Sequence, residues 1–396
     1  MKNIGVIIDS ELYGDARVLN ECKILANHGF NVFILCFNYG KYEQKEILSD
    51  FQISRISINQ KLRNILFAFN NTVEFYNLFW KRQIKKFIKE YAIDALHVHD
   101  LYMSKPAYYA TKNLLVEFTL DLHENYPAAV KGYKWMYQFP LRFLIRPNKW
   151  EKLEKKYLSY PKNIVVLSET FRDDLLEKYS FLNANQFAIY PNIPDLKEFD
   201  NYIIDPTIYN KGSDFILFYF GVISERRGIF TVIDALKILL KNNKNIKLLL
   251  IGPVDKIEKS RFFEAISTPE IKESIIHYSW KDISLLPSFI EISDVCLSPI
   301  VKNDQHESGV ANKVFQYMLF ERPLIVSDCK PQAKIVVEEN CGLVFKSEDV
   351  NDLAKNIEIF YKDINLRLEI GRNGKKAVEE KYNTQIAGKN LVNLYS

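Results

Sequence analysis

Several residue patterns that mark common classes of protein are missing from this sequence of 396 residues. The five cysteines form no C-x-x-C pair and have no histidine grid near them, so we expect reduced core thiols rather than disulfides or a structural metal. No G-x-G-x-x-G follows the first expected strand and no G-x-x-x-x-G-K-[ST] occurs, which argues against a nicotinamide dehydrogenase and a P-loop nucleotidase. H-E-x-x-H and G-x-S-x-G are also absent, so the chemistry must come from dispersed residues.

Long apolar runs and a large charge excess are lacking too. No uncharged apolar stretch approaches the ~20 residues that span a bilayer. A net charge of +4 is too small to indicate nucleic-acid binding. The opening MKNIGVIIDSE reaches an acid at Asp9 and has no small-residue cleavage site, so we expect no signal peptide and a cytoplasmic protein. The 27 Phe, 23 Tyr and 4 Trp supply too much apolar surface for a disordered chain.

Short apolar runs alternate with amphipathic stretches along the whole chain. The expected strands are Ile4–Ile8, Val32–Cys36, Ala95–His99, Leu115–Leu122, Ile164–Leu167, Phe215–Phe220, Ile246–Ile251, Ile275–Tyr278, Val295–Pro299, Leu324–Ser327 and Leu343–Phe345. Helical periodicity covers Ala16–His28, Ile229–Leu240, Asn312–Phe320 and Val350–Tyr361. This alternation predicts parallel sheets with helices on both faces.

A stretch without periodicity, Tyr190–Ser213, collects prolines, asparagines and a glycine and is typical of a linker. We therefore predict two doubly wound, Rossmann-like α/β domains, residues 1–200 and 201–375, that face each other across a cleft. A further amphipathic helix is expected over residues 376–396.

Polar residues follow the expected strands at the edge where open parallel sheets bind their ligands. In the first half these are Gly14, Asp15 and Arg17, then His99 and Asp100, then His123 and Glu124. A single histidine at a strand end is more often structural than chemical, and two at adjacent strands leave both interpretations open. No metal site is expected, because a transition metal needs three convergent ligands of fixed type.

In the second half, Lys313 and Gln316 lie on the helix face opposite Val314 and Met318. A lysine and an amide above a glycine-containing helix start suit a diphosphate and a hydroxylated ring, and free N–H groups at that start add to the anion site. Arg227, before Gly228, is a second candidate phosphate ligand. The alternative is an ordinary solvated helix with Asn312 as its N-cap, and a surface arginine.

Several segments in the same order resemble the retaining, family-4-type glycosyltransferases of the GT-B fold. They are GDARVLNECKILANHGFNVFIL, LHVHDL, LDLHENYP, IVVLSETFRDDL, IYPNIPD, YFGVISERRGIFTVIDAL and ANKVFQYMLFERPLIVSD. The resemblance covers almost the whole chain. It implies an acceptor-binding domain over residues 1–200, a donor-binding domain over 201–375, and a terminal helix that packs back on the first domain.

The resemblance also implies an activity: transfer of a sugar from a UDP- or GDP-linked donor to a hydroxyl of a glycan or lipid-linked acceptor, in cell-surface polysaccharide synthesis and without a further cofactor. The implied catalytic residues are His123, Arg227 and Lys313. The implied donor-binding residues are Gly14, Asp15, Glu307, Ser308, Gly309, Asn312 and Gln316. The implied acceptor-side residues are Arg17, His99, Asp100 and Glu124.

The sequence departs from the family at its paired glutamates, because Ser308 and Gln316 stand at those positions. Gln316 can still bond a ribose hydroxyl, and Glu307 is a candidate replacement for the missing acid. Two alternatives therefore remain. One is a non-catalytic partner that binds nucleotide sugars in a glycan-assembly complex, and the other is a nucleotide-sugar epimerase on the same fold.

Two segments, Lys131–Lys156 and Asn64–Tyr91, mix basic and bulky apolar residues. That composition suits an interfacial segment on anionic lipid. The alternative is a pair of helices that pack their aromatic side chains inward and leave a solvated basic rim. We predict weak contact with an anionic membrane surface on the inner face of the cell membrane.

Overall fold

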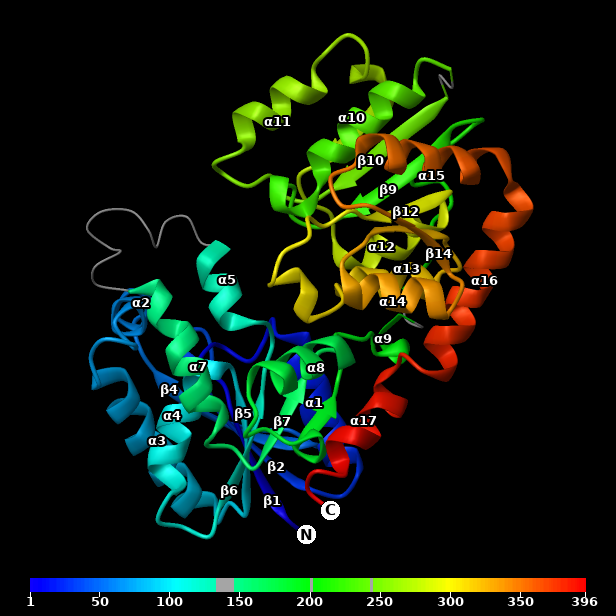
Figure 1. The fold of residues 1–396 in the computed structure, drawn as a ribbon. Helices are drawn as coiled ribbons and strands as arrows, with labels where there is room; N and C mark the ends of the chain where they lie inside the picture. The colour runs from blue at the N-terminus through cyan, green and yellow to red at the C-terminus, as the bar shows by residue number, and fades with distance from the viewer. Residues whose placement is uncertain (133–145, 200–201, 243–244) are drawn as a thin grey trace. The chain divides into compact units, whose positions relative to one another are not determined.

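The computed structural model describes residues 1–132, 146–199, 202–242 and 245–396 (Figure 1). The chain divides into two compact units, Met1–Pro191 with Thr384–Ser396, and Asn192–Asn383. The boundaries expected after residues 200 and 375 compare with breaks after residues 191 and 383. The first break therefore lies at the start of the proline- and asparagine-rich stretch rather than inside it.

The first unit contains an eight-stranded sheet in the order β3-β4-β2-β1-β5-β6-β7-β8. Its strands are β1 (Asn3–Ile7), β2 (Asn31–Asn38), β3 (Lys45–Ile47), β4 (Phe51–Ser57), β5 (Ala95–His99), β6 (Glu117–Asp121), β7 (Asn163–Val166) and β8 (Phe187–Ile189). All pairings are parallel except that of β3 with β4. The central strands are buried on both faces, as expected of a parallel sheet covered by helices.

The helices of this unit are α1 (Ala16–Asn27), α2 (Gln60–Ala68), α3 (Phe75–Tyr91), α4 (Ser104–Thr111), α5 (Tyr126–Gly132), α7 (Trp150–Leu158), α8 (Glu169–Lys178) and α17 (Thr384–Val392). One core joins the sheet to α3 and α4 through large side chains such as Phe37, Trp80 and Phe87. The strand ends that carry polar residues are thus fixed by a packed layer beneath them.

The second unit contains a six-stranded parallel sheet in the order β11-β10-β9-β12-β13-β14. The strands are β9 (Phe215–Phe220), β10 (Ile246–Ile251), β11 (Ile275–Tyr278), β12 (Val295–Ser298), β13 (Leu324–Ser327) and β14 (Gly342–Phe345). The helices are α9 (Leu196–Phe199), α10 (Ile229–Leu239), α11 (Lys259–Ile266), α12 (Leu286–Glu291), α13 (Asn312–Leu319), α14 (Lys330–Glu338), α15 (Val350–Lys362) and α16 (Ile364–Glu380). The prediction of two parallel-sheet α/β domains is confirmed.

The prediction of one continuous helix over residues 376–396 is wrong, because α16 ends at Glu380 and a separate helix, α17, begins at Thr384. The Asn383 side chain caps the end of α16: its amide donates hydrogen bonds to the carbonyls of Val378 (3.0 Å) and Glu379 (2.9 Å). α17 then packs against α1, with Gly388 over Ile24. The end of the chain therefore does belong to the first unit, as the sequence predicts.

All five cysteines are buried and carry free thiols. Across the ranges that the structure describes, every helix is too short or too polar to cross a membrane. Residues 133–145, the centre of the basic and aromatic segment Lys131–Lys156, lie outside those ranges.

Candidate active site

The polar strand ends of the first unit meet at β5 and β6. These strands pair in parallel, and their register sets His99 beside Asp121. Asp100 follows β5 and His123 follows β6 at the same edge of the sheet. On the facing helix α1, Arg17 lies in the first turn, where it reaches the end of β6.

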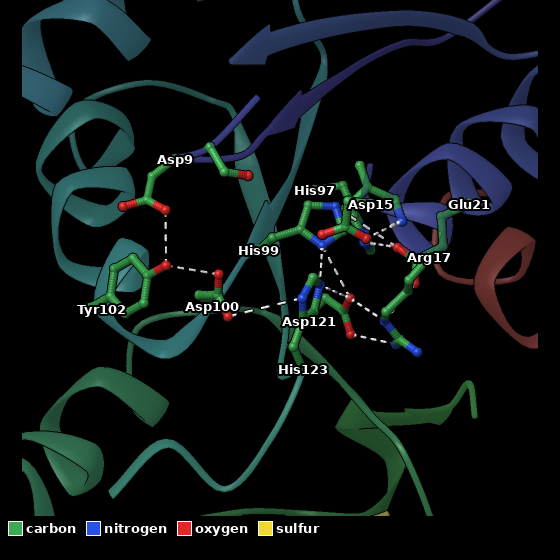
Figure 2. Close-up of polar contacts among 12 residues, drawn as sticks. Asp9, Asp15, Arg17, Glu21, His97, His99, Asp100, Tyr102, Asp121 and His123 are labelled. Atoms are coloured by element: carbon green, nitrogen blue, oxygen red, sulfur yellow. Dashed lines mark hydrogen bonds and ion pairs between the residues drawn. The ribbon is translucent and has the colours of Figure 1, made fainter. Parts of the chain in front are cut away.

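Four side chains from these elements form a tight cluster (Figure 2). The Nδ1 atom of His99 lies 2.8 Å from Nε2 of His123 and 3.1 Å from Oδ2 of Asp121. His123 Nε2 is itself 3.1 Å from Oδ2 of Asp121. Arg17 donates two hydrogen bonds to the Asp121 carboxylate, from Nη2 at 2.7 Å and from Nε at 2.9 Å. Asp121 thus holds an arginine and a histidine in fixed positions.

The charges in this cluster set the protonation of its members. Burial by itself lowers the pKa of His123, but the carboxylates of Asp100 and Asp121 raise it to about 10. Although burial favours the neutral acid, the charges of Arg17 and His123 hold the pKa of Asp121 well below its usual range. Burial lowers the pKa of His99 to about 3. At neutral pH, His123 is therefore an imidazolium and His99 a neutral ring that accepts a hydrogen bond from it.

Asp100 occupies a strained position beside His123. Its backbone has φ 71° and ψ 139°, a region that non-glycine residues rarely adopt. One carboxylate oxygen lies 4.0 Å from Nδ1 of His123, and the other accepts a 2.8 Å hydrogen bond from the Tyr102 hydroxyl. The same hydroxyl lies 2.8 Å from Oδ1 of Asp9. Figure 2 shows the resulting line of contacts from Asp9 through Tyr102 and Asp100 to His123.

The other predicted residues of this unit have different surroundings. Arg17 and His99 have side chains only 8% and 0% exposed, and both contact the Asp121 carboxylate. Asp15 caps α1 by accepting a hydrogen bond from the amide of Val18 (3.2 Å). Gly14, at φ +112°, is exposed in the preceding turn, and Glu124 is half-buried between β6 and α5.

Sequence reasoning missed five members of the network: Glu21, His97, Asp121, Asp9 and Tyr102. Glu21 lies one helical turn after Arg17, with its Oε1 3.1 Å from the Arg17 Nε atom. His97 shares a strand face with His99 and places Nε2 2.8 Å from Oε2 of Glu21. Three signals were present in the sequence. Glu21 is one helical turn from Arg17, His97 is two strand residues from His99, and Asp121 is the aspartate of LDLHENYP.

Glu21, His97, His99 and Asp121 offer ligand atoms within 4.8 Å of one another, a spacing that a metal ion also requires. In the structure these groups bind each other and Arg17. Both oxygens of Asp121 accept hydrogen bonds from the guanidinium, and both ring nitrogens of His97 have partners. A cation at this place would compete with Arg17 for the same carboxylates.

The second unit carries a separate group of cations at the end of β9. Lys313, on the first turn of α13, is 8% exposed, and its Nζ lies 3.8 Å above the ring of Tyr219. A Cβ atom at Gly221 would lie 3.2 Å from this nitrogen, so the glycine leaves room for the lysine. Burial, and then repulsion by Arg227, hold the pKa of Lys313 well below its usual range. The positive charge of Arg227 therefore acts on Lys313 and disfavours its protonated form.

Arg227 ends a single 3₁₀ turn, Glu225–Arg227, and Gly228 follows it with φ +74° as the N-cap of α10. A Cβ atom at Gly228 would lie 1.7 Å from the carbonyl oxygen of Pro299. Only glycine fits this contact with the end of β12. The turn that presents Arg227 is thus locked against the sheet.

The remaining donor-side candidates surround the start of α13. The helix begins after Ala311, so Asn312 is its exposed first residue and not its N-cap. Gln316 is buried, which excludes a solvated face for this side of α13. The Ser308 hydroxyl donates to the carbonyl of Gln305 (2.6 Å), and Gly309 has extended backbone.

Glu307 is bound elsewhere: its carboxylate accepts from the amide of Lys330, at 3.3 and 3.2 Å, at the start of α14. The replacement of the missing acid by Glu307 stays a prediction. Its neighbour His306 is buried, donates from Nδ1 to the carbonyl of Val301 (2.6 Å), and leaves Nε2 without a hydrogen-bond partner among the described residues. This histidine was not predicted.

The two units define the class of the protein. Sucrose-phosphate synthase from Thermosynechococcus elongatus has the same fold, with a TM-score of 0.75 and 16% identity over 100% of this chain and 98% of that one. The Escherichia coli trehalose-6-phosphate protein solved with UDP-2-fluoro glucose gives a TM-score of 0.74 and 12% identity, over 99% and 98% of the two chains. At these identities the likeness establishes the fold, which is GT-B.

The sequence families narrow the class. Residues 16–198 match the family described as Glycosyltransferase Family 4, and residues 204–377 match Glycosyl transferases group 1. The chain belongs to this group 1, family 4 set of glycosyltransferases, and the resemblance found in the sequence is confirmed.

Two curated relatives agree with this assignment. The capsular polysaccharide biosynthesis glycosyltransferase CapM of Staphylococcus aureus is 26% identical over 253 residues, 62% of this chain and 64% of CapM. An uncharacterised glycosyltransferase of Methanocaldococcus jannaschii is 20% identical over 222 residues, 56% of this chain and 54% of the relative. The matched regions span less than two thirds of either relative.

Proposed function

We propose that this protein transfers a sugar from a nucleotide diphosphate sugar to a hydroxyl of a glycan or lipid-linked acceptor, with retention at the anomeric carbon. The observation that carries the proposal is Lys313. Its buried amino group has no ion-pair partner in the part of the chain that the structure describes, and burial with repulsion from Arg227 holds its pKa low, so an anion bound beside it would favour its charged form. A buried cation beside a second cation is costly unless an anion binds between them, and a diphosphate is such an anion.

The proposed reaction breaks the bond between the anomeric carbon and the β-phosphate oxygen and forms a bond from the same face to the acceptor oxygen. Negative charge grows on the departing diphosphate, which takes the acceptor proton. Arg227, Lys313 and the amides at the start of α13 would stabilise that charge in place, which is often the largest single contribution to catalysis. No side-chain nucleophile is needed.

His123 is the proposed catalytic residue of the first unit. Its side chain is 21% exposed, whereas Asp121 and His99 beneath it are fully buried. Held as an imidazolium by Asp100 and Asp121, it would donate a hydrogen bond to the donor sugar or to the leaving oxygen and would not act as a base. Gly14, Asp15, Asp100 and Glu124 are proposed to lie around the substrates, with Arg17 and His99 positioning His123 from below.

We propose that transfer requires no bound divalent metal. In the donor unit, Arg227 and Lys313 supply two positive charges, which is the contribution that a metal makes to a departing diphosphate in other enzymes. Transfer should therefore continue at an unchanged rate in excess EDTA. A rate that collapses in EDTA and recovers with Mg²⁺ would contradict this part of the proposal.

The decisive experiment measures transfer by variants of the two cations. We expect Arg227→Ala and Lys313→Ala each to lower kcat by about 10²-fold or more, because each removes a group aimed at the developing charge. Lys237→Ala, which removes a partly exposed lysine of α10 paired with Asp234, is the matched control and should leave kcat unchanged. Wild-type rates in a variant that lacks both Arg227 and Lys313 would refute the assignment. The anomeric configuration of the product tests retention.

A second candidate function is a non-catalytic partner that binds nucleotide sugars. Ser308 and Gln316 replace the family glutamates, and Glu307 is bound to the start of α14. If this candidate is correct, the wild-type protein will bind a donor but transfer nothing across a panel of glycan and lipid-linked acceptors. Interconversion of the free donor without an acceptor would instead indicate the epimerase.

We propose a role in cell-surface polysaccharide synthesis at the inner face of the membrane, which CapM supports by its capsular polysaccharide function. Trp80 and Phe87 of α3 are buried, so those aromatic residues pack inward. Helix α2, in contrast, buries no residue, and apolar side chains are exposed around it: Leu62, Ile65, Val73, Phe75 and Leu78. Exposed Arg82, Lys85, Lys86 and Lys89 follow on α3. Apolar side chains beside basic ones fit an anionic lipid surface.

Vesicle flotation tests this surface. Wild-type protein should float with vesicles rich in phosphatidylglycerol at low salt and should be released as salt screens the charges. Ile65→Ser with Phe75→Ser should abolish flotation. Ile257→Ser with Phe263→Ser, which removes two exposed apolar side chains of the second unit, should not. Equal binding by all three proteins would show that α2 is not the contact.

A further inference from the structure

One contact of the first unit lies outside the substrate-facing edge of the sheet. Tyr395, which follows α17, is 3% exposed, and its hydroxyl lies 2.6 Å from Nδ1 of His97 on β5. Its backbone carbonyl accepts a 2.9 Å hydrogen bond from Lys2 Nζ, and the ring of Phe30 packs edge-on against its ring. The tyrosine is therefore held firmly, with its one polar atom directed at a histidine.

An unbroken series of side-chain contacts leads from this hydroxyl to His123. Nε2 of His97 is 2.8 Å from Oε2 of Glu21, and Oε1 of Glu21 is 3.1 Å from Nε of Arg17. Arg17 holds both oxygens of Asp121, and Asp121 contacts His123 at 3.1 Å. Figure 2 shows the part of this series from His97 to His123. Every member before His123 is buried, so water cannot take the place of a lost partner.

The hydrogen positions in this series are fixed by its two ends. A carboxylate oxygen 2.8 Å from Nε2 of His97 requires a hydrogen on that nitrogen. In the neutral ring, Nδ1 is then bare and needs a donor. Burial raises the pKa of Tyr395, so its hydroxyl keeps its hydrogen and can supply the bond. Without the hydroxyl, Nδ1 is a buried acceptor that lacks this donor, and a shift of the ring towards another donor weakens its bond to Glu21.

We propose that Tyr395 is a positioning residue for His123, acting through His97, Glu21, Arg17 and Asp121. The inference rests on the proposed function, in which His123 contacts the reacting sugar. It gives the last residues of α17 and beyond a role in the reaction as well as in packing. A weaker His97 bond would leave Glu21 short of a hydrogen-bond donor, because its Oε1 atom contacts Arg17 as an ion pair and has no hydrogen bond among the described residues. The pair of Arg17 with Asp121 would then shift to compensate.

Tyr395→Phe tests this directly, because it keeps the ring and removes the hydroxyl alone. We expect kcat to fall about tenfold to hundredfold, with the KM for the donor changed less than twofold. The midpoint of the His123 titration, followed by NMR of the labelled imidazole, should move to lower pH by about one unit as Asp121 loosens. Tyr179→Phe is the matched control, since it removes a buried hydroxyl bonded to Glu154 in the same unit, outside the network. It should leave both readouts unchanged.

The two readouts keep the inference separate from the proposed function. An unchanged His123 titration in Tyr395→Phe overturns the coupling, whatever happens to the rate. A fall in thermal stability equal to that of Tyr179→Phe, with kcat and titration intact, would show that Tyr395 only packs. If the wild-type protein transfers no sugar, the proposed function fails, whereas the His123 titration still tests the contact series.

Discussion

At the scale of single residues, Asp9 is a carboxyl group on which burial and a neighbouring arginine have opposite effects. It is 2% exposed, and burial raises its pKa to about 6, against the lowering effect of Arg63, whose Nη2 lies 2.8 Å from Oδ2. The hydroxyls of Tyr76 and Tyr102 also reach it. The single hydrogen of the Tyr102 hydroxyl serves both Asp9 and Asp100, so one of the two carboxylates is poorly satisfied when both are ionised.

Asp9→Asn should remove a pH dependence from the stability of the fold. The folded protein binds the Asp9 proton with a pKa of about 6, against 3.8 for the ordinary group. Its stability therefore falls as pH rises through that window, by about 3 kcal/mol in total. Asparagine has no such proton, so the difference in unfolding free energy between the two proteins should change by about this amount between pH 3.8 and 6. Urea unfolding across the window measures it, and a constant difference would contradict the shift.

Single residues also show which contacts of the site could be predicted from the sequence and which could not. His99, Asp100 and His123 could be placed together because strand ends of one parallel sheet meet at one edge. Tyr395 could not, because its contact with His97 joins positions 298 residues apart. Nothing in the local pattern of either residue encodes that pairing. The hydrogen bond that Glu307 accepts from the backbone amide of Lys330, on another helix, could not be predicted for a similar reason.

At the scale of elements, short runs rich in apolar residues were the most predictable. β5, β9, β10, β11 and β13 have the bounds expected from their apolar sequences. β4 was missed because Arg55 occupies a buried position in its alternation, paired there with Glu46. β3 and β8 have three residues each, too few for a periodic signal. The end of α16 is capped by an asparagine side chain, which a hydrophobic pattern does not detect.

The element that presents Arg227 allows a matched comparison of two glycines. Gly228 and Gly212 both have positive φ, +74° and +50°, but a Cβ atom would clash with the Pro299 carbonyl only at Gly228 and meets nothing within 4 Å at Gly212. We expect Gly212→Ala to cost about 1 kcal/mol, the price of the left-handed conformation. Gly228→Ala should cost about 4 kcal/mol and weaken donor binding, because the 3₁₀ turn must move. Chemical unfolding of both variants measures these losses of stability. Equal losses would show that the backbone at Pro299 can move away from the added methyl group at little cost.

At the scale of the whole molecule, the proposed functional residues belong to two units that each pack around their own core. Each unit has its own sheet and its own hydrophobic core. The first contains the network around His123, in which Arg17 is paired with Asp121, and the second contains Lys313, which is buried without an ion-pair partner among the described residues and is repelled by Arg227. This asymmetry predicts that the donor binds to the second unit and that its binding energy stabilises that unit.

A thermal-shift panel of UDP- and GDP-linked sugars tests that division. A donor present at a hundred times its Kd stabilises the folded state by about 2.7 kcal/mol, because it binds only that state. For a unit of this size the midpoint should rise by about 5–10 °C. Hydrogen exchange should slow at β9 and at the start of α13, where Lys313 lies. Lys313→Ala should lose the shift, whereas His123→Asn, in the other unit, should keep most of it. A diphosphate bound beside Lys313 must interact with its charge. Equal thermal shifts in wild type and Lys313→Ala, or slowed hydrogen exchange confined to the first unit, would therefore mean that the donor does not bind at Arg227 and Lys313.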